Sequence, residues 1–238
     1  MNEATRRDWL QQAQARWDAR AEAWSVRAAA NAAAADRPAD LDRIWSALAL
    51  RPGAQVLDAG CGSGQFALAL AARGVRVIGV DLSPEMIRLA ENSANRENAP
   101  SPVRWAVGSV DALHLADASV DAVHARMVLP FVPDVPAALR EFRRILRPGG
   151  RLLASTAGAL SPIYRESWRR HLSGSESCNY LLPWELEPLL ATAGWRLRDE
   201  WGEWGEDVRG NPNLAVTGAV VDRRLQQATA TTWTIIAE

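Results

Sequence analysis

Apolar segments of two kinds alternate along the chain. Short runs rich in Val, Ile, Leu and Ala predict strands, and longer segments with apolar residues every three or four positions predict helices. The predicted strands cover residues 56–59, 75–80, 103–107, 120–128, 151–156, 195–204 and 231–236. The predicted helices cover residues 7–35, 40–50, 67–73, 84–95, 135–146, 184–193 and 214–228. This alternation predicts a doubly wound α/β fold with a mainly parallel seven-stranded sheet, and such sheets bind ligands at the carboxyl ends of their strands.

The N-terminal segment carries its large apolar residues at helical spacing. Leu10, Ala13, Trp17 and Trp24 fall on one face of the helix predicted over residues 7–35. This face either packs its tryptophans on the body of the protein or covers the ligand site as a lid. The two roles are compatible, so we expect an N-terminal helical lid.

A glycine-rich turn follows the first predicted strand. Gly60, Gly62 and Gly64 alternate with small residues, which lets the backbone approach a nucleotide-like ligand closely. The spacing differs from the G-x-G-x-x-G fingerprint of dinucleotide-binding proteins. Asp58 precedes the turn, and its carboxylate would repel a pyrophosphate but tolerate a cationic amino group. The turn therefore favours a nucleoside that carries an amino acid.

An acidic residue ends the second predicted strand. Asp81 lies 21 positions after Gly60 (81 − 60). At about this distance, a carboxylate at a strand end accepts hydrogen bonds from both hydroxyls of a ribose. The turn and Asp81 together predict a nucleoside site.

These motifs resemble those of one enzyme family. The pattern D-x-G-x-G-x-G at 58–64, the acidic strand end at Asp81 and the segment Leu-Arg-Pro-Gly-Gly at 146–150 resemble the class I S-adenosylmethionine-dependent methyltransferases, especially the group that alkylates quinones, lipids and natural products. The resemblance covers roughly residues 51–156. It implies S-adenosyl-L-methionine as cofactor and in-line transfer of a methyl group to a small-molecule acceptor, catalysed mainly by proximity and orientation.

The resemblance also implies which residues hold the cofactor. Many relatives have Asp where Ser109 stands, so Ser109 keeps hydrogen-bonding ability without the charge. Asp111 is an alternative partner there, although we expect it to face solvent. Arg126 either binds a carboxylate or pairs with a nearby acid. The expected cofactor-binding residues are Asp58, Gly60, Cys61, Gly62, Gly64, Asp81, Leu82, Met86, Ser109, Val110, Arg126 and Trp24.

The acceptor is expected beside the cofactor, under an irregular insert at residues 158–183. Its expected contacts are Trp17, Met127, Pro130, Tyr164 and Tyr180. Among the histidines, His171 lies in the insert and is the candidate general base, which only a hydroxyl or unactivated carbon acceptor would need. We expect His124, in the middle of a strand, to be a hydrogen-bonded core histidine.

Composition and charge narrow the choice of partners. The 238 residues carry a net charge of −1 and no basic block, which does not favour nucleic acid. The two cysteines and three scattered histidines do not have the spacing of metal ligands. Two cysteines also provide no disulfide framework, which fits a reducing cytoplasm. We expect no metal and no membrane segment, and the oligomeric state stays open, with a homodimer as one alternative.

We expect one methyltransferase domain over residues 1–238. It would comprise a helical cap at 1–50, a cofactor-binding core at 51–157, the insert at 158–183, and C-terminal helices and strands at 184–238. Two other hypotheses stay open at this point. One is an NAD-dependent oxidoreductase on a similar sheet, and the other is a non-catalytic protein that binds S-adenosylmethionine.

Overall fold

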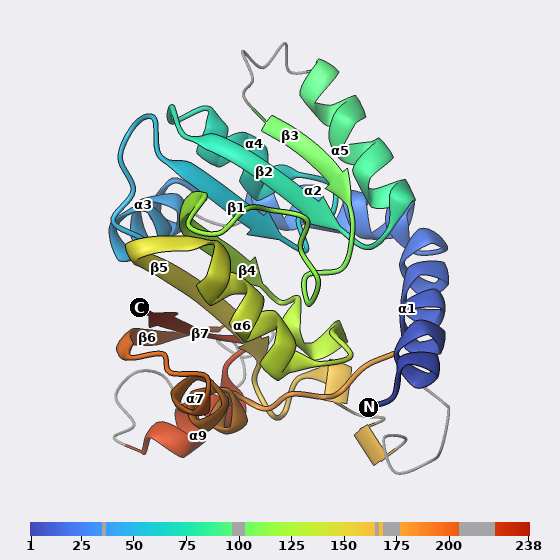
Figure 1. The fold of residues 1–238 in the computed structure, drawn as a ribbon, viewed down its shortest axis with the longest axis vertical. Coiled ribbons are helices and arrows are strands. Elements are labelled where there is room, and N and C mark those ends of the chain that lie inside the picture. The colour runs from blue at the N-terminus through green and yellow to red at the C-terminus, as the bar shows by residue number, and fades with distance from the viewer. Residues whose placement is uncertain (35–36, 97–102, 165–166, 169–176, 205–221) are drawn as a thin grey trace.

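One twisted sheet runs through the whole protein. The computed structural model describes residues 1–34, 37–96, 103–164, 167–168, 177–204 and 222–238. Within these residues, seven strands pair in the order β3-β2-β1-β4-β5-β7-β6 (Figure 1). Only β7 is antiparallel to its neighbours, so the expected mainly parallel sheet is confirmed. The strands are β1 Gln55–Ala59, β2 Arg76–Asp81, β3 Val103–Val107, β4 Val120–Arg126, β5 Leu146–Ala157, β6 Leu197–Glu203 and β7 Thr232–Ala237.

Helices cover both faces of this sheet. The helices are α1 Glu3–Asp18, α2 Ala21–Ala34, α3 Arg37–Ala47, α4 Gln65–Ala71, α5 Pro84–Arg96, α6 Val135–Ile145, α7 Pro183–Thr192 and α9 Arg223–Thr229, with short 3-10 turns at Leu129–Phe131 and Pro162–Tyr164. Apolar residues of α3 and α4 share one buried cluster with the sheet, and those of α6 and α7 share another with its opposite face. No helix in the described part of the chain combines the length and apolar character needed to span a lipid bilayer.

Local start and stop signals fix several helix ends as expected. The hydroxyl of Ser83 accepts a hydrogen bond from the Met86 amide at 3.1 Å, and the carboxylate of Asp134 accepts one from the Ala137 amide at 2.8 Å. Each side chain thereby satisfies an amide that the first helical turn leaves without a partner. These caps place the starts of α5 and α6 where the sequence predicted them.

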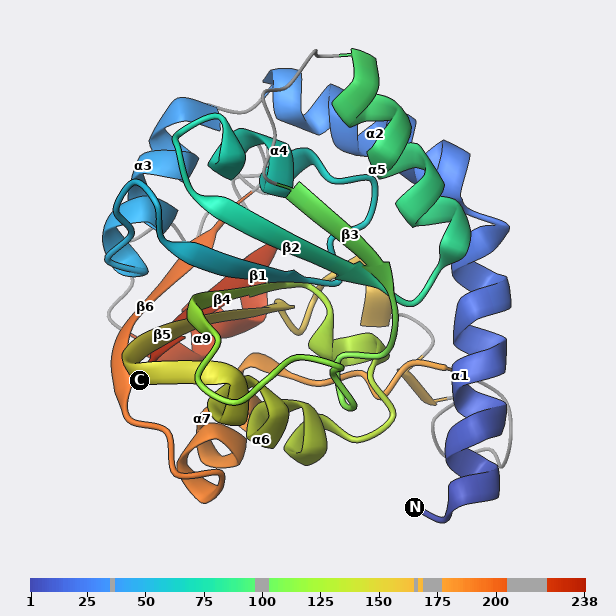
Figure 2. The same cartoon turned by 45° about the horizontal axis from the view of Figure 1, so that its top comes forward.

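The N-terminal segment differs from its prediction. A single helix over 7–35 is wrong, because the chain turns at residues 19–20 and forms α1 and α2, whose directions differ clearly in Figure 2. The end of α1 is tied to α5, where the carboxylate of Asp18 accepts a hydrogen bond from Ser83 Oγ at 2.5 Å. On either side of the turn, α1 and α2 both contact α5. Of the helix expected at 214–228, residues 214–221 lie outside the described residues.

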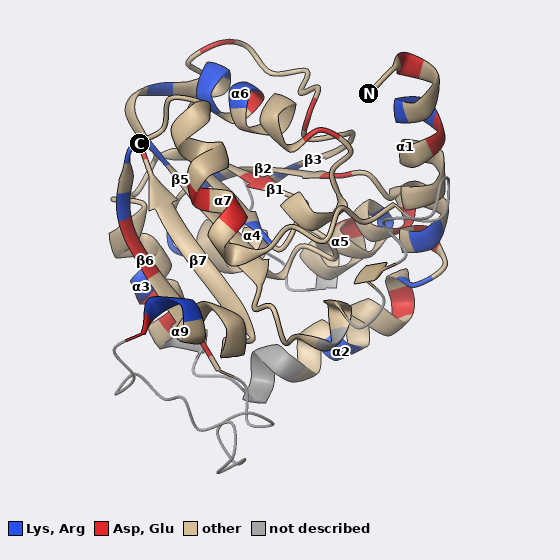
Figure 3. Cartoon of the chain, turned by 90° about the horizontal axis from the view of Figure 1, so that it is seen from below, with Lys and Arg blue, Asp and Glu red and all other residues tan. Residues whose placement is uncertain are grey.

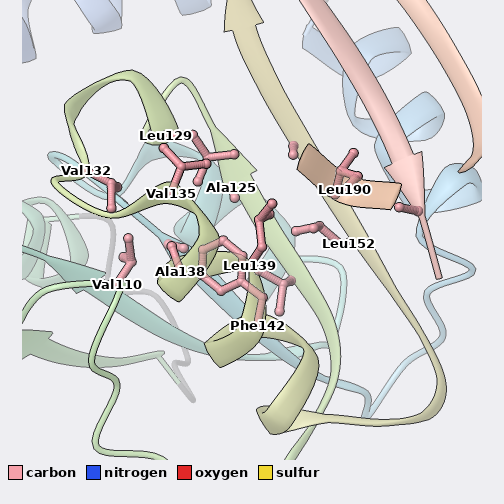
Figure 4. Close-up of a cluster of buried hydrophobic side chains, with 14 of the residues drawn as sticks. Val110, Ala125, Leu129, Val132, Val135, Ala138, Leu139, Phe142, Leu152 and Leu190 are labelled. Carbon is pink, nitrogen blue, oxygen red and sulfur yellow. The ribbon is translucent and has the colours of Figure 1, made fainter. Parts of the chain in front are cut away.

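The largest buried cluster lies between the sheet and α6 (Figure 4). Leu139, Phe142 and Ile145 project from α6 and are completely buried against sheet residues that include Val123 and Leu152. These positions follow the three- and four-residue spacing of one helix face. The helix therefore contributes its whole apolar face to the core that supports β4 and the site at its carboxyl end.

We expect Phe142→Ala to lower the free energy of unfolding by about 3–5 kcal/mol, because it removes a buried ring and leaves a cavity. Arg140→Ala, at an exposed position of the same helix, should change it by about 0.5 kcal/mol or less. Urea unfolding followed by circular dichroism measures both. Equal losses in the two variants would contradict this account of the core.

Candidate functional site

The glycine turn is held over the end of β2. The amides of Gly60 and Cys61 both donate to the carbonyl of Val80, at 2.8 and 3.0 Å. Gly60 has a φ of +70°, and a Cβ built on it would lie 2.5 Å from Val128 Cγ2. A side chain at this position would therefore strain the backbone and displace β4's neighbouring loop.

Gly64 has a different role from Gly60. It precedes α4 with a φ of +83°, and a Cβ there would lie 2.6 Å from the ring of Trp105. The absence of a side chain thus allows the turn to pack on β3. This is a structural reason for the third glycine, which does not border the cavity described below.

Asp81 joins the turn to the start of α5. Its Oδ2 accepts from the Gly62 amide at 2.9 Å, and its Oδ1 accepts from the Ser83 amide at 2.9 Å. Burial raises the pKa of Asp81 above its usual 3.8, although these two hydrogen bonds act in the opposite direction. The nearby Asp58 adds to the increase. The carboxylate is thus fixed in place by the backbone that it helps to hold.

Asp58 lies beneath the turn, paired with a histidine. Its Oδ1 is 2.8 Å from Nδ1 of His124 on the adjacent strand, and both side chains are buried. The ring of Phe66 lies against His124, with centroids 5.0 Å apart. Among the described residues, Asp58 Oδ2 and His124 Nε2 have no hydrogen-bond partner. The core position expected for His124 is observed, with one of its two nitrogens bonded.

Arg126 ends β4 and pairs with an acid. Its guanidinium donates to both carboxylate oxygens of Glu203, at 3.3 and 2.7 Å, and lies 5.1 Å from the centre of the Phe66 ring. Of the two roles left open by the sequence, the structure shows the ion pair. Arg126 nevertheless borders the cavity.

Asp111 corrects an expectation. It does not face solvent, because its side chain is fully buried and receives two hydrogen bonds from Arg6, at 3.1 and 2.7 Å. The hydroxyl of Ser109 also donates to this carboxylate. Arg6 belongs to α1, so the pair fastens the N-terminal cap beside Ser109. Hydrogen bonding to Asp111 also raises the pKa of Arg6.

Aromatic side chains of the cap close over the turn. The ring of Trp17 meets those of Trp24 and Phe131 edge-on, with centroids 5.5 and 5.0 Å away. Trp24 Nε1 lies 3.7 Å from the position that a Cβ of Gly62 would occupy. Helices α1 and α2 thus form the lid expected from the sequence.

The turn, the strand ends and the cap enclose a cavity of about 700 Å³. It is large enough for a cofactor and a small second molecule. The structure brings most of the expected residues together here, namely Gly60, Gly62, Asp81, Leu82, Met86, Ser109, Val110, Arg126, Trp17, Trp24, Met127 and Tyr180.

Other expected residues lie behind the cavity wall. Asp58, Cys61 and Gly64 support the turn from below, and Pro130 is buried in a 3-10 turn. The Tyr164 hydroxyl donates to the Leu181 carbonyl and lies 2.9 Å from Thr156 Oγ1, and burial raises the pKa of this phenol. These bonds explain why Tyr164 does not reach the cavity. His171 lies outside the described residues.

Leu10 and Ala13, on the helix face expected to cover the site, also line the cavity. The lining residues that were not anticipated are Arg16, Arg20, Ala23, Arg27, Gly108, Val128, Phe131, Val132, Pro133, Ile163 and Cys178. Helical spacing from Trp17 and Trp24 would have found Arg20 and Arg27, because residues three or four apart share a face. The sequence gives no comparable signal for Ile163 or Cys178, which come from irregular chain.

Known proteins resemble this chain in sequence and in fold. Residues 57–154 match the model of a family described as a methyltransferase domain. A ubiquinone biosynthesis O-methyltransferase of Xanthomonas campestris is 35% identical over 187 residues, which cover 75% of this chain and 77% of that protein. A malonyl-(acyl-carrier protein) O-methyltransferase of Serratia marcescens is 34% identical over 144 residues, which cover 60% of this chain and 53% of the relative. The chain thus spans about half the length of the latter.

A solved structure shares the fold. A SAM dependent methyltransferase from Aquifex aeolicus superposes with a TM-score of 0.60 at 17% sequence identity, covering 83% of this chain and 88% of that one. The family model includes the glycine turn and Asp81, the two elements that the sequence singled out. With the Xanthomonas relative matching three quarters of it, the chain belongs to the class I S-adenosylmethionine-dependent methyltransferases.

Proposed function

We propose that the protein transfers the methyl group of S-adenosylmethionine to a small-molecule acceptor. One observation carries the proposal: the glycine turn, the Asp81 carboxylate and the tryptophans of the cap border the same cavity. A cavity of this kind holds two reactants at contact distance and limits the access of water to them. Such positioning supplies a large part of the barrier reduction in a bimolecular transfer.

The residues present fit this cofactor. Each oxygen of Asp81 accepts one backbone hydrogen bond and has capacity for a second, so the pair suits a ribose diol. Gly62 presents bare backbone to the cavity. The Ser109 hydroxyl donates a hydrogen bond to Asp111, which leaves the Ser109 oxygen free to accept a hydrogen bond from an exocyclic amine.

The amino-acid end of the cofactor also finds suitable groups. Arg20 and Arg27 border the cavity on either side of Trp24 in the sequence, and a guanidinium matches a carboxylate well. The face of Trp24 suits a cation such as the sulfonium. We propose that these side chains hold that end of the cofactor.

Bound S-adenosylmethionine supplies a methyl group already activated by the positive charge on sulfur. The chain's own residues then bind the two reactants, orient them and exclude water. The turn and Asp81 fix the nucleoside, and Trp17, Met127 and Tyr180 line the remaining space for the acceptor. Met127 has a φ of +57°, and its amide is held by Ser155 Oγ at 3.0 Å, which fixes this strained residue at the cavity.

The acceptor we propose is a small molecule, not a nucleic acid, in line with the net charge of −1. The cytoplasmic location stays a prediction, and the oligomeric state stays open, with a homodimer as one alternative. The oxidoreductase hypothesis is not favoured, because the relatives reported above are methyltransferases.

Calorimetry with S-adenosylmethionine and with NAD tests the choice of cofactor directly. Tight NAD binding without a response to S-adenosylmethionine would refute the proposal. A protein that binds S-adenosylmethionine but never forms S-adenosylhomocysteine with a supplied acceptor would be the non-catalytic binder.

We expect Asp81→Asn to weaken S-adenosylhomocysteine binding by about 1.5–3 kcal/mol, or roughly 10–150-fold, because hydrogen bonds to a charged acceptor are lost. In the unchanged protein the affinity should fall as the pH is lowered through the pKa of Asp81. Burial raises that pKa, so the fall begins at a higher pH than for an ordinary aspartate.

Titration calorimetry from neutral to acid pH measures both effects. The pH-dependent fall should be absent in Asp81→Asn. Glu22→Gln is a matched control, since this exposed residue of α2 does not border the cavity. An asparagine variant with full affinity and the same pH profile would remove Asp81 from the site.

We expect Gly60→Ala to reduce S-adenosylhomocysteine affinity at least roughly tenfold, because the new Cβ collides with Val128 and deforms the turn. Gly149→Ala is the control. Gly149 has a similar φ of +77°, but a Cβ there meets nothing within 4 Å. It should cost about 1–2 kcal/mol of stability from backbone strain alone and leave affinity unchanged. Thermal unfolding and calorimetry separate the two, and equal affinities would contradict the steric argument.

A further inference from the structure

The cavity carries more positive charge than the cofactor balances. Four arginines border it, Arg16, Arg20, Arg27 and Arg126, against the single carboxylate of Asp81. Glu203 neutralises Arg126, and no ion pair with a carboxylate among the described residues is seen for the other three. S-adenosylmethionine, on which this inference rests, brings one carboxylate but also an ammonium and a sulfonium. Arg20 and Arg27 are exposed to solvent, whereas Arg16 is half-buried, so Arg16 is the cation whose charge a second bound anion would balance.

The position of Arg16 separates it from the other two. Arg20 and Arg27 flank Trp24, which approaches the glycine turn at Gly62. Arg16 lies on α1, where basic and acidic bands alternate in Figure 3, and its Nη1 is 3.5 Å from Ser177 Oγ. The chain beyond Ser177 borders the cavity through Cys178 and Tyr180. Arg16 thus lies in the part of the cavity bordered by Cys178 and Tyr180, which we call the acceptor side. The amino-acid end of the cofactor is placed beside Arg20 and Arg27 and does not need Arg16.

The rest of the acceptor side is apolar. Leu10, Met127, Phe131, Val132 and Ile163 border it together with the ring of Trp17. Such a wall favours a molecule whose body is a hydrocarbon or an aromatic ring. Beside it, one guanidinium offers two parallel donors to a carboxylate.

The described lining residues provide little for general-base catalysis. They include no histidine and no glutamate, and the one carboxylate, Asp81, is already held by two backbone amides. A hydroxyl acceptor must lose a proton as it is methylated, and it needs a base for that. An acceptor that is already an anion needs none.

We infer that the acceptor is a carboxylic acid with an apolar body, held by Arg16 and methylated on its carboxylate. In the transfer, a lone pair of one carboxylate oxygen forms the new bond to the methyl carbon. The bond between that carbon and sulfur breaks, and its electron pair stays on sulfur. The positive charge of the sulfonium and the negative charge of the carboxylate disappear together, so no proton is released. The products are a neutral methyl ester and S-adenosylhomocysteine.

Methylation of the carboxylate also favours release of the product. The ester no longer carries the charge that paired with Arg16, so its binding is weaker than that of the acid. The same guanidinium that selects the substrate thereby favours release of the product.

A transfer assay with octanoate, decanoate and cinnamate, each beside its matched alcohol and amine, tests the chemistry. S-adenosylmethionine labelled in the methyl group is the donor. We expect label only with the acids, and mild base should release it as methanol, as it does from a methyl ester. Base-stable label, label on an alcohol or amine, or no transfer to any acid by protein that binds S-adenosylmethionine would overturn the inference. Absence of S-adenosylmethionine binding would instead overturn the proposed function itself.

A binding experiment tests the role of Arg16 without turnover. Decanoate is titrated into protein saturated with S-adenosylhomocysteine, and decanol is titrated as the uncharged probe. We expect Arg16→Gln to weaken decanoate binding at least tenfold and to leave decanol and S-adenosylhomocysteine binding unchanged. Arg7→Gln is the control, because Arg7 is exposed on the same helix and does not border the cavity. Equal decanoate affinity in the two variants, or equal loss of decanol and decanoate, would overturn the assignment.

Discussion

The site depends on how β2 ends. Its last two residues hold the glycine turn at two points: the Val80 carbonyl accepts from Gly60 and Cys61, and the Asp81 carboxylate accepts from Gly62. The second oxygen of Asp81 holds the start of α5 through Ser83. One strand end thus fixes both the backbone that approaches the ligand and the helix beside it. Because each partner is main chain or buried, the arrangement exists before any ligand binds, and little order has to be created on binding.

This arrangement concentrates negative charge under the turn. Asp58 and Asp81 lie close enough that each raises the pKa of the Cys61 thiol, to which burial contributes most. The thiol therefore stays protonated, so Cys61 is a small supporting residue and not a nucleophile. The His124 ring lies beside Asp58, and its Nδ1 gives the Oδ1 of this buried carboxylate a hydrogen-bond partner. A buried carboxylate without such a partner would be costly.

The sequence predicted the features that depend on neighbouring residues. Strand and helix periodicity gave the order of the elements, and Ser83 and Asp134 gave the helix starts, because a cap acts within three residues. Contacts between distant residues had no local signal. Arg6 and Asp111 are 105 positions apart, and Asp58 and His124 are 66 apart. The same limit explains why Asp111 was expected in solvent and why the internal bonding of Tyr164 was not foreseen.

The Arg6–Asp111 pair also accounts for a departure from the family pattern. The resemblance stated from the sequence implies Asp where this chain has Ser109, and here the nearest carboxylate in the sequence is that of Asp111, two residues later. A buried carboxylate needs a cation, and α1 supplies it through Arg6. Ser109 then donates its hydroxyl hydrogen bond to that carboxylate, so the Ser109 oxygen can act only as an acceptor at the cavity edge. The Ser109 hydroxyl at this edge is therefore oriented by Asp111, whose charge the cap neutralises through Arg6. The exposed pair between Arg88 and Glu22 contributes little by comparison, because solvent screens it. The lid is thus fastened by an ion pair between a half-exposed arginine and a buried carboxylate, and this pair also shapes the site beneath it.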